Sequence, residues 1–163
     1  METTRKYYFT VEGETEKRYL TWLQKTINAT NEASANVSFS IGVKTKPTSF
    51  VKKLSLAGGK PTSIAHIADI GGPSSTDIQK IDKLLIDLKK SQKTKKVSYI
   101  FGYSNYCFEL WIILHKMNCN NHMPNKNSYL ALINKGYGMQ FRSLSDYKEE
   151  KKIPKDTCHT YIG

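Results

Sequence analysis

Residues 6–16 read KYYFTVEGETE, and this stretch decides the fold. Residues 7–11 are all aromatic or β-branched, which is typical of a β-strand. Glu12 and Gly13 break that pattern. Apolar residues then recur at helical spacing: Tyr19, Leu20, Leu23 and Ile27. The stretch therefore predicts a strand from Lys6 to Val11, a sharp turn that carries carboxylates, and a helix that ends at about Asn28.

The rest of the chain continues the alternation of strands and helices. Further strands are predicted at 37–43, 63–70 and 97–101. Helices are predicted at 47–56, from Thr76 onward, at 107–116 and at 129–134. The alternation predicts an α/β domain with a mostly parallel sheet of about four strands, flanked by helices.

Two of the predicted helices have informative patterns. Thr76 and Gln79 stand at capping-box spacing at the start of one of them. One face of this helix is apolar and is expected to be buried: Ile78, Ile81, Leu84, Leu85 and Leu88. The helix at 107–116 reads CFELWIILHK and is apolar nearly all round, which predicts a buried helix with Glu109 embedded in it.

The composition indicates a folded protein with an anionic partner. The chain has 163 residues, and 25 Lys+Arg against 14 Asp+Glu give a net charge of +11. The basic excess excludes an acidic solvating protein, and hydrophobic residues make up 39%, enough for a core, which argues against global disorder. Nucleic acid is the default partner of so basic a chain. Four lysines are candidates for phosphate contacts, although a solvated helix face explains them equally well: Lys80, Lys83, Lys89 and Lys90.

The sequence also bounds the location of the protein and its division into regions. No apolar run approaches the roughly 20 residues that span a bilayer, and the amino terminus does not resemble a signal sequence, so we expect a cytoplasmic protein. A core is predicted at 1–117 and a C-terminal extension at 118–163. Because the chain stops soon after a lysine-rich segment, we expect a truncated chain or a missing C-terminal helix. A naturally short chain is the alternative.

Carboxylates stand at the ends of two predicted strands and at the start of the buried helix. Glu12 follows the first strand, Asp69 ends the third, and Glu109 comes shortly after Ser104 and Asn105. Ligands of open α/β sheets bind at the carboxyl ends of the strands, so these groups are expected to converge. Oxygen ligands suit Mg²⁺ or Mn²⁺. Such a site in a basic chain points to chemistry on phosphodiesters.

Each candidate also has a structural explanation. Glu14 and Glu16 suit the positive end of a helix dipole, and Asp69 could cap the glycine-rich turn that follows it. Glu109 needs a partner inside its apolar helix, which could be a metal, a lysine or backbone N–H groups. His115 on the same helix is more often a satisfied core histidine than a catalytic one. Zinc is a further, weaker reading, on residues of the right types in a nonstandard spacing: Cys119, His122, Cys158 and His159.

Two motifs resemble a known family. VEGETE at 11–16 resembles the EGxTE turn of TOPRIM-type domains. SNYCFELWIILHK at 104–116 resembles a signature of RloB-like proteins, a family linked to restriction–modification loci and abortive phage defence. The lysine-containing segment at 147–156 resembles the tail of the same family.

The resemblance implies a TOPRIM-like three-layer sandwich and a Mg²⁺-dependent nuclease site. By position, Glu12 matches the TOPRIM glutamate, a general acid/base, and Asp69 matches the first aspartate of a DxD motif, a metal ligand. Glu109 would complete the site as a catalytic and metal-binding residue. The remaining positions are assigned supporting roles: Gly13, Glu16, Ser104, Asn105 and His115.

The sequence departs from the family pattern at two positions. Gly71 stands where the pattern has the second aspartate, and Tyr106 stands where it has proline. Asp77 could replace the missing carboxylate if the loop before it folds back, or one metal could be held with Glu109. The expected function is a Mg²⁺- or Mn²⁺-dependent nuclease, acting on DNA or RNA in bacterial phage defence. The alternative is an inactive module of a defence complex that binds nucleic acid or a partner protein, such as an ATPase encoded nearby.

Overall fold

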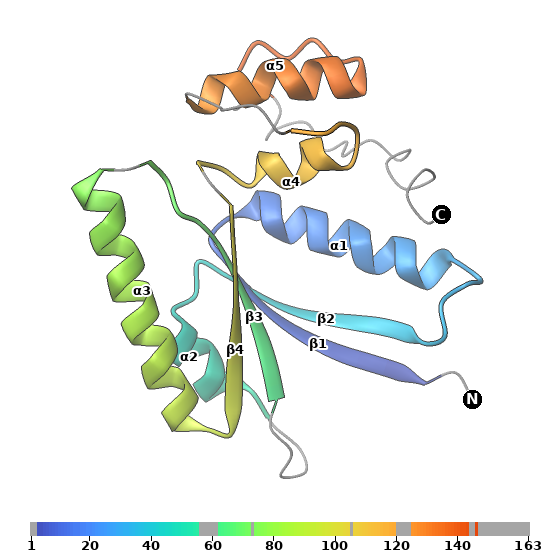
Figure 1. Cartoon of the computed structure of the whole chain (residues 1–163). Coiled ribbons are helices and arrows are strands. Elements are labelled where there is room, and N and C mark those ends of the chain that lie inside the picture. The colour runs from blue at the N-terminus through green and yellow to red at the C-terminus, as the bar shows by residue number, and fades with distance from the viewer. Residues whose placement is uncertain are drawn as a thin grey trace.

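A single parallel sheet of four strands organises the computed structural model of the chain (Figure 1). The strands lie in the order β2-β1-β3-β4. Their bounds are β1 Thr4–Val11, β2 Asn36–Val43, β3 Thr62–Asp69 and β4 Val97–Ser104. The structure describes residues 3–55, 62–72, 74–104, 106–119, 125–143 and 146. The predicted α/β class, with a parallel sheet of four strands, is confirmed.

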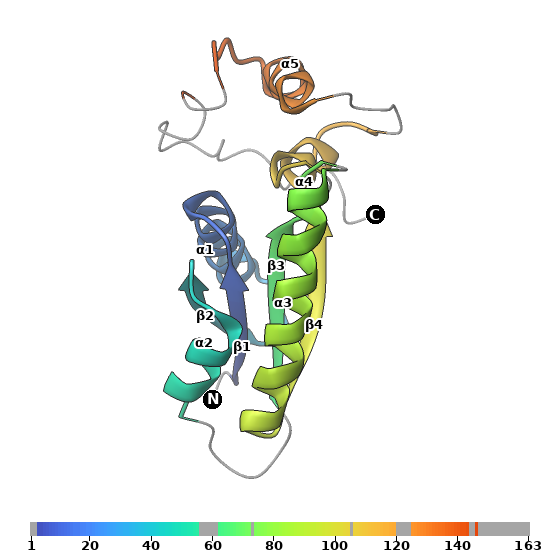
Figure 2. The same ribbon diagram turned by 90° about the vertical axis from the view of Figure 1, so that its left-hand side faces the viewer.

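Helices cover both faces of this sheet. They are α1 Glu14–Ala29, α2 Pro47–Lys53, α3 Ser75–Thr94, α4 Glu109–Leu114 and α5 Lys126–Tyr137. Helix α1 packs along β2, whereas α2 and α3 pack on each other and lie across the sheet from α1 (Figures 1 and 2). Helices α4 and α5 lie beyond the carboxyl ends of the strands (Figure 1). The described part of the chain therefore forms three layers, as the family resemblance implied.

Alternation along β1 explains why both faces of the sheet are covered. Tyr8 packs with Val51 of α2 and Ile64 of β3, which is fully buried. Its neighbour Phe9 points to the other face, where its ring lies 4.9 Å from that of Phe39 in β2. Successive side chains of a strand point to opposite faces, so one aromatic strand supplies both layers.

The structure corrects several predicted boundaries. Helix α3 begins at Ser75, one residue before the predicted start, and its cap is Ser74, whose hydroxyl accepts from the Asp77 N–H at 3.2 Å. Strand β4 continues through Gly102 to Ser104, three residues beyond its predicted end at 101. Helix α4 is shorter than predicted and begins at Glu109. These differences move the ends of elements by a few residues and leave their order unchanged.

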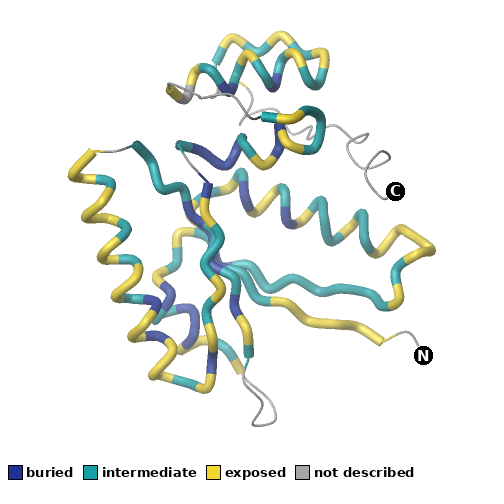
Figure 3. The backbone as a smooth tube through the Cα atoms, viewed as in Figure 1, coloured by how far each residue is buried: buried dark blue, intermediate teal, exposed yellow. Residues whose placement is uncertain are grey.

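The apolar face predicted for α3 is only partly buried. Leu88 and Ser91, toward its carboxyl end, are its buried residues, while Ile78 is 54% exposed and Leu85 is 38% exposed. Figure 3 shows that most of α3 is exposed. Helical spacing places these residues on one side of the helix, but the sheet meets only the part that carries Leu88 and Ser91.

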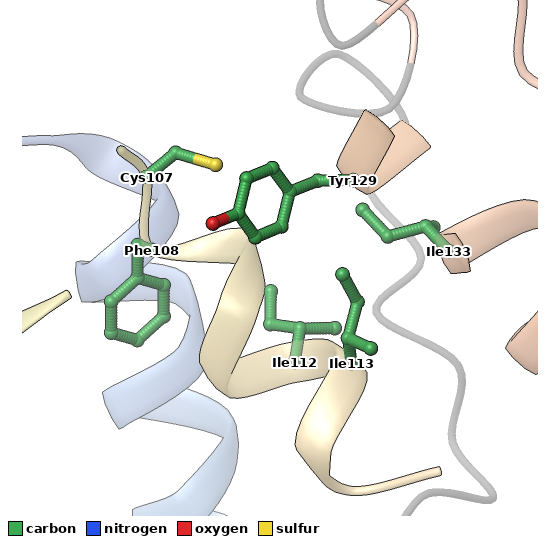
Figure 4. Packing of buried hydrophobic residues seen from close by; sticks show 6 residues of the cluster. All are labelled: Cys107, Phe108, Ile112, Ile113, Tyr129 and Ile133. Carbon is green, nitrogen blue, oxygen red and sulfur yellow. The ribbon is translucent and has the colours of Figure 1, made fainter. Parts of the chain in front are cut away.

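A compact apolar cluster holds α4 in place (Figure 4). Its buried members come from α4, the residues before it, and α5: Cys107, Phe108, Ile112, Ile113, Tyr129 and Ile133. Asn125 caps α5 by accepting from the Ser128 N–H at 3.2 Å. Trp111 and Leu114 on the outer side of α4 are 44% and 47% exposed, so the expectation of a helix buried all round is wrong. Because the inner side is packed against α5, the start of α4 is fixed relative to the sheet.

Two further observations concern the described part of the chain. Cys107 and Cys119 are free thiols. Among the described residues, no helix has the length and apolar character needed to cross a membrane. The lysine-rich end of the chain lies outside the described residues.

Candidate metal and catalytic site

The order of strands creates a switch point between β1 and β3. From β1 the chain crosses to β2 on one side, and it later places β3 on the other side of β1. In open parallel sheets, ligands bind outside the carboxyl ends of the strands at such a point. A pocket of about 430 Å³ opens there, lined by five acidic residues: Glu12, Glu14, Glu16, Asp69 and Glu109. The structure thus brings together the four acidic residues that the sequence singled out for the site.

Hydrogen bonds join the ends of three strands beside this pocket. The backbone N–H of Asp69, the last residue of β3, donates to Oε2 of Glu12 at 3.2 Å. The Ser104 hydroxyl, at the end of β4, donates to Oδ1 of Asp69 at 2.5 Å. Ser104 is buried, so this bond is shielded from water. Ser104 therefore orients the Asp69 carboxylate.

Glu16 turns back from the first turn of α1 toward Gly13. Its side chain is 4% exposed, and its Oε2 has no hydrogen-bond partner in the part of the chain that the structure describes. A Cβ atom on Gly13 would lie 2.9 Å from that oxygen. Gly13 itself has an extended backbone, with φ −143°. Glycine is therefore required here to leave room for the Glu16 carboxylate.

The pocket carboxylates repel one another. Burial, joined by the negative charges of Asp69, Glu109 and Glu12, raises the pKa of Glu16 from 4.5 to about 7. A buried carboxylate among like charges needs a proton or a cation. Glu14, in contrast, is exposed and pairs with Lys17 at 3.4 Å. A favourable interaction with the helix dipole therefore explains Glu14, but it does not explain Glu16.

Glu109 is the most deeply buried acidic residue described. It begins α4 and is 1% exposed. The preceding Phe108 is anchored in the cluster between α4 and α5, which fixes the direction in which Glu109 enters the pocket. Burial, together with the charge of Glu109, raises the pKa of the Cys107 thiol. The thiol therefore stays protonated and does not compete as a nucleophile.

Asp77 does not replace the second aspartate of the motif, at whose position this chain has Gly71. Its carboxylate accepts from the Ser74 hydroxyl at 2.6 Å and from the Gly72 N–H at 3.2 Å, and it does not line the pocket. The bond from Ser74, with that from Gly72, lowers the pKa of Asp77. Gly71 adopts a left-handed backbone, φ 78°, and a Cβ atom there would lie 2.8 Å from Cγ of Asp77. The loop does fold back, but Asp77 fastens it to the start of α3.

Tyr106, which stands where the resembling motif has proline, has a left-handed backbone with φ 62°. Its side chain packs against the cluster between α4 and α5. A Cβ atom on Gly72 would lie 3.5 Å from Cε1 of the Tyr106 ring. The ring therefore lies between the loop after β3 and the helices beyond it.

Tyr106→Pro should destabilise the fold by at least about 2 kcal/mol, because proline fixes φ near −65° and cannot take this conformation. Urea denaturation measures the loss in the free energy of unfolding. Tyr106→Gly is the matched control, since glycine permits the left-handed backbone but also lacks the ring. A proline variant as stable as the glycine variant would contradict the left-handed conformation of Tyr106.

Of the other predicted supporting residues, His115 lies apart from the carboxylates. Asn105 is outside the described residues. His115 does not line the pocket, and its Nε2 is hydrogen-bonded to the Tyr19 hydroxyl at 2.8 Å. Burial lowers the pKa of His115, so it is neutral at pH 7. This contact fastens the end of α4 to α1, which agrees with the reading of His115 as a satisfied core histidine.

The predicted lysines of α3 are exposed and do not line the pocket: Lys80, Lys83, Lys89 and Lys90. Lys80 pairs with Asp77 at 3.5 Å. Because α3 lies across the sheet from α1, these lysines form a separate surface (Figure 2). Their contact with nucleic acid stays a prediction.

Sequence reasoning missed two basic residues of the pocket, Arg18 and Lys44. Arg18 lies in α1, two residues after Glu16. Lys44 directly follows β2, so it occupies the same kind of position as Glu12 after β1. A search of every strand end for charged residues of either sign would have found Lys44.

The donor chemistry of the pocket fits a hard divalent cation. Carboxylate oxygens are the ligands that Mg²⁺ and Mn²⁺ prefer, and Oε2 of Glu16 is buried without a hydrogen bond. In the described part of the chain, no three Asp, Glu, His or Cys side chains are close enough together to hold a metal ion as they stand. Binding therefore requires the carboxylates to approach one another. The zinc candidates His122, Cys158 and His159 lie outside the described residues.

The fold and the pocket together define a class, the parallel α/β domains that bear a cluster of carboxylates at the switch point of the sheet. The family model of RloB-like proteins matches residues 7–162, and the chain therefore belongs to the RloB-like family. No curated protein and no solved structure matches it significantly.

Proposed function

We propose that this protein is a divalent-metal-dependent nuclease that hydrolyses phosphodiester bonds in DNA or RNA, within a phage-defence system. The observation that carries the proposal is the convergence of five acidic residues, one of them Glu16 with an unsatisfied buried oxygen, at the switch point of the sheet. So many like charges in one pocket are accommodated best by a bound cation. The net charge of +11 suits a polyanionic substrate.

The residues divide into those that hold a cation and those that move a proton. Asp69 and Glu109 would hold Mg²⁺ or Mn²⁺, with Glu16 as a further oxygen donor. When bound, such a cation neutralises the charge that develops on the phosphate and activates a water molecule. Glu12 is exposed beside Asp69, so a proton that it accepts from the attacking water can pass to solvent.

One observation favours a second function, that of a non-catalytic module that binds nucleic acid or a partner protein. Gly71 replaces an acidic residue of the motif, and Asp77 is engaged with Ser74 and Gly72. The pocket therefore has one carboxylate fewer than the motif requires. Such a module would bind nucleic acid without metal and lose affinity steeply with salt, or it would co-purify with a partner such as an ATPase.

A cleavage assay distinguishes the two functions. Purified protein is incubated with single- and double-stranded DNA and RNA, in Mg²⁺, in Mn²⁺ and in EDTA. We expect cleavage of at least one substrate with metal and none with EDTA. Binding that ignores EDTA, with no cleavage in either metal, would contradict the nuclease and support the second function.

A further inference from the structure

We infer that Arg18 and Lys44 form an anion-binding part of the pocket that holds the phosphate next to the one that reacts. This inference rests on the proposed function, because it names how the same pocket holds a nucleic-acid strand. Both residues line the pocket together with its five acidic residues. The pocket is therefore bipolar, with an acidic part for a cation and a basic part for an anion.

The backbone around Lys44 is fixed at the end of β2. The Lys44 N–H donates to the Val11 carbonyl at 2.9 Å, which extends the pairing of β1 and β2 by one residue. The Thr45 hydroxyl donates to the Val43 carbonyl, also at 2.9 Å. Pro47 then begins α2. The position of Lys44 is thus set by hydrogen bonds on both sides.

Lys44 adopts a left-handed backbone, with φ 49°. This conformation is unfavourable for a residue with a long side chain and is usual for glycine. Strained residues of this kind gather at sites where a side chain is required in one direction. Here the side chain of Lys44 lines the pocket and gives it a positive charge. Glycine would fit the backbone conformation but would carry no charge.

The spacing of the strands places Lys44 beside the reacting phosphate. β2 and β3 flank β1. Lys44, directly after β2, and Asp69, the last residue of β3, therefore stand on strands whose axes lie two strand spacings apart, roughly 10 Å. A phosphate held through Asp69 and one held by Lys44 are therefore neighbours along a strand of nucleic acid. Lys44 accordingly acts in binding and not on the reacting atoms.

The charge of Lys44 is available to a substrate. Ion pairs among the described residues join Lys17 to Glu14 and Lys80 to Asp77, and Lys44 takes part in none of them. Lys44 is exposed at the rim of the pocket. Arg18, from α1, adds a guanidinium, which can bind a phosphate through two parallel hydrogen bonds.

Binding of a short, fluorescently labelled single-stranded DNA tests this inference, measured by anisotropy in Ca²⁺ over a range of salt concentrations. Lys44→Gln should weaken binding about fivefold. It should also reduce the slope of log K against log [salt] by about 0.7, the value for one lost phosphate contact. Arg18→Gln should act in the same direction. Lys44→Gly should lose affinity equally with an unchanged or higher Tm, which excludes a folding defect.

Two exposed lysines outside the pocket serve as matched controls. Lys46 lies two residues after Lys44, and Lys25 lies on the same helix as Arg18, but neither lines the pocket. The control variants are Lys46→Gln and Lys25→Gln. Neither should change the affinity or the salt slope. Three outcomes would each overturn the inference. Lys44→Gln and Lys46→Gln could weaken binding equally, Lys44→Gln could leave the salt slope unchanged, or the native protein could fail to bind DNA.

The test of the anion site and the test of the proposed nuclease can fail independently of each other. DNA binding that depends on Lys44, in a protein that cleaves nothing, would support the anion site and contradict the nuclease. Metal-dependent cleavage with a salt slope that ignores Lys44 would support the nuclease and overturn the anion site.

Discussion

Asp69→Asn should lower the rate of metal-dependent cleavage by about 100-fold or more. Asparagine has the shape of aspartate, and its Oδ1 can still accept the hydrogen bond that the Ser104 hydroxyl makes to Asp69. The backbone N–H that donates to Glu12 is unaffected by the change. The substitution therefore removes a negative charge from the pocket and leaves the strand ends joined. Initial rates at increasing Mn²⁺ concentrations measure both the loss and any weakening of metal affinity.

Asp77→Asn is the matched control, because Asp77 lies in the same connection between β3 and α3 and its carboxylate serves that loop. We expect cleavage within about twofold of the native rate and a small loss in the free energy of unfolding, because the neutral amide accepts weaker hydrogen bonds from Ser74 and Gly72. Equal losses of cleavage in the two variants would place the essential acid in the loop. Full activity in both Asp69→Asn and Glu12→Gln would refute the assignment of the site.

The carboxylates of the pocket could be predicted because each stands beside a local signal. Glu12 and Asp69 end aromatic or apolar runs, and Glu109 lies in an apolar helix. The carboxyl ends of parallel strands meet at one edge of a sheet, so the order of the strands did not need to be known. Lys44 stands beside the same kind of signal, directly after β2, but its distance from the carboxylates depends on the pairing of β2 with β1.

The depth of burial was less predictable than the position of each element. The spacing of Ile78 and Leu85 defines a side of α3, but it does not say how far the sheet extends beneath the helix. The role of Asp77 depends on the left-handed turn at Gly71, which is a matter of loop geometry. The raised pKa of Glu16 depends on its burial and on the charges of Asp69, Glu109 and Glu12, which come from other parts of the chain. Each of these features is set by tertiary contacts that a local pattern does not contain.

Glu16→Gln should remove a pH-dependent loss of stability in the metal-free protein. The pKa of Glu16 is about 7 in the folded protein and near 4.5 in the unfolded chain. Between these values the folded protein keeps a proton that the unfolded chain releases, so the free energy of unfolding falls as the pH rises. The contribution is complete below pH 4.5 and lost above pH 7, and it amounts to at most about 3 kcal/mol. Glutamine does not titrate, so the variant gains stability over the native protein across this window.

Urea denaturation in EDTA at several pH values measures this gain as a difference between two proteins. The two proteins must be compared at each pH because His66 affects stability in the opposite sense. Burial lowers the pKa of His66 to about 4, so its contribution to the free energy of unfolding grows as the pH rises toward 6.5. His66 is present in both proteins and cancels. Parallel stability curves for the native protein and Glu16→Gln would contradict the raised pKa.

Repeating the measurement in Mg²⁺ connects this titration with the proposed site. A cation among the carboxylates favours the charged form of Glu16 and lowers its pKa, so the native protein should recover stability above pH 7. Glu16→Gln lacks one oxygen donor of full charge and should gain less from Mg²⁺. The destabilising repulsion and the affinity for a cation then have the same origin, since the charges that raise the pKa of Glu16 are those that a divalent ion would neutralise. Equal stabilisation of both proteins by Mg²⁺ would show that the ion binds without Glu16.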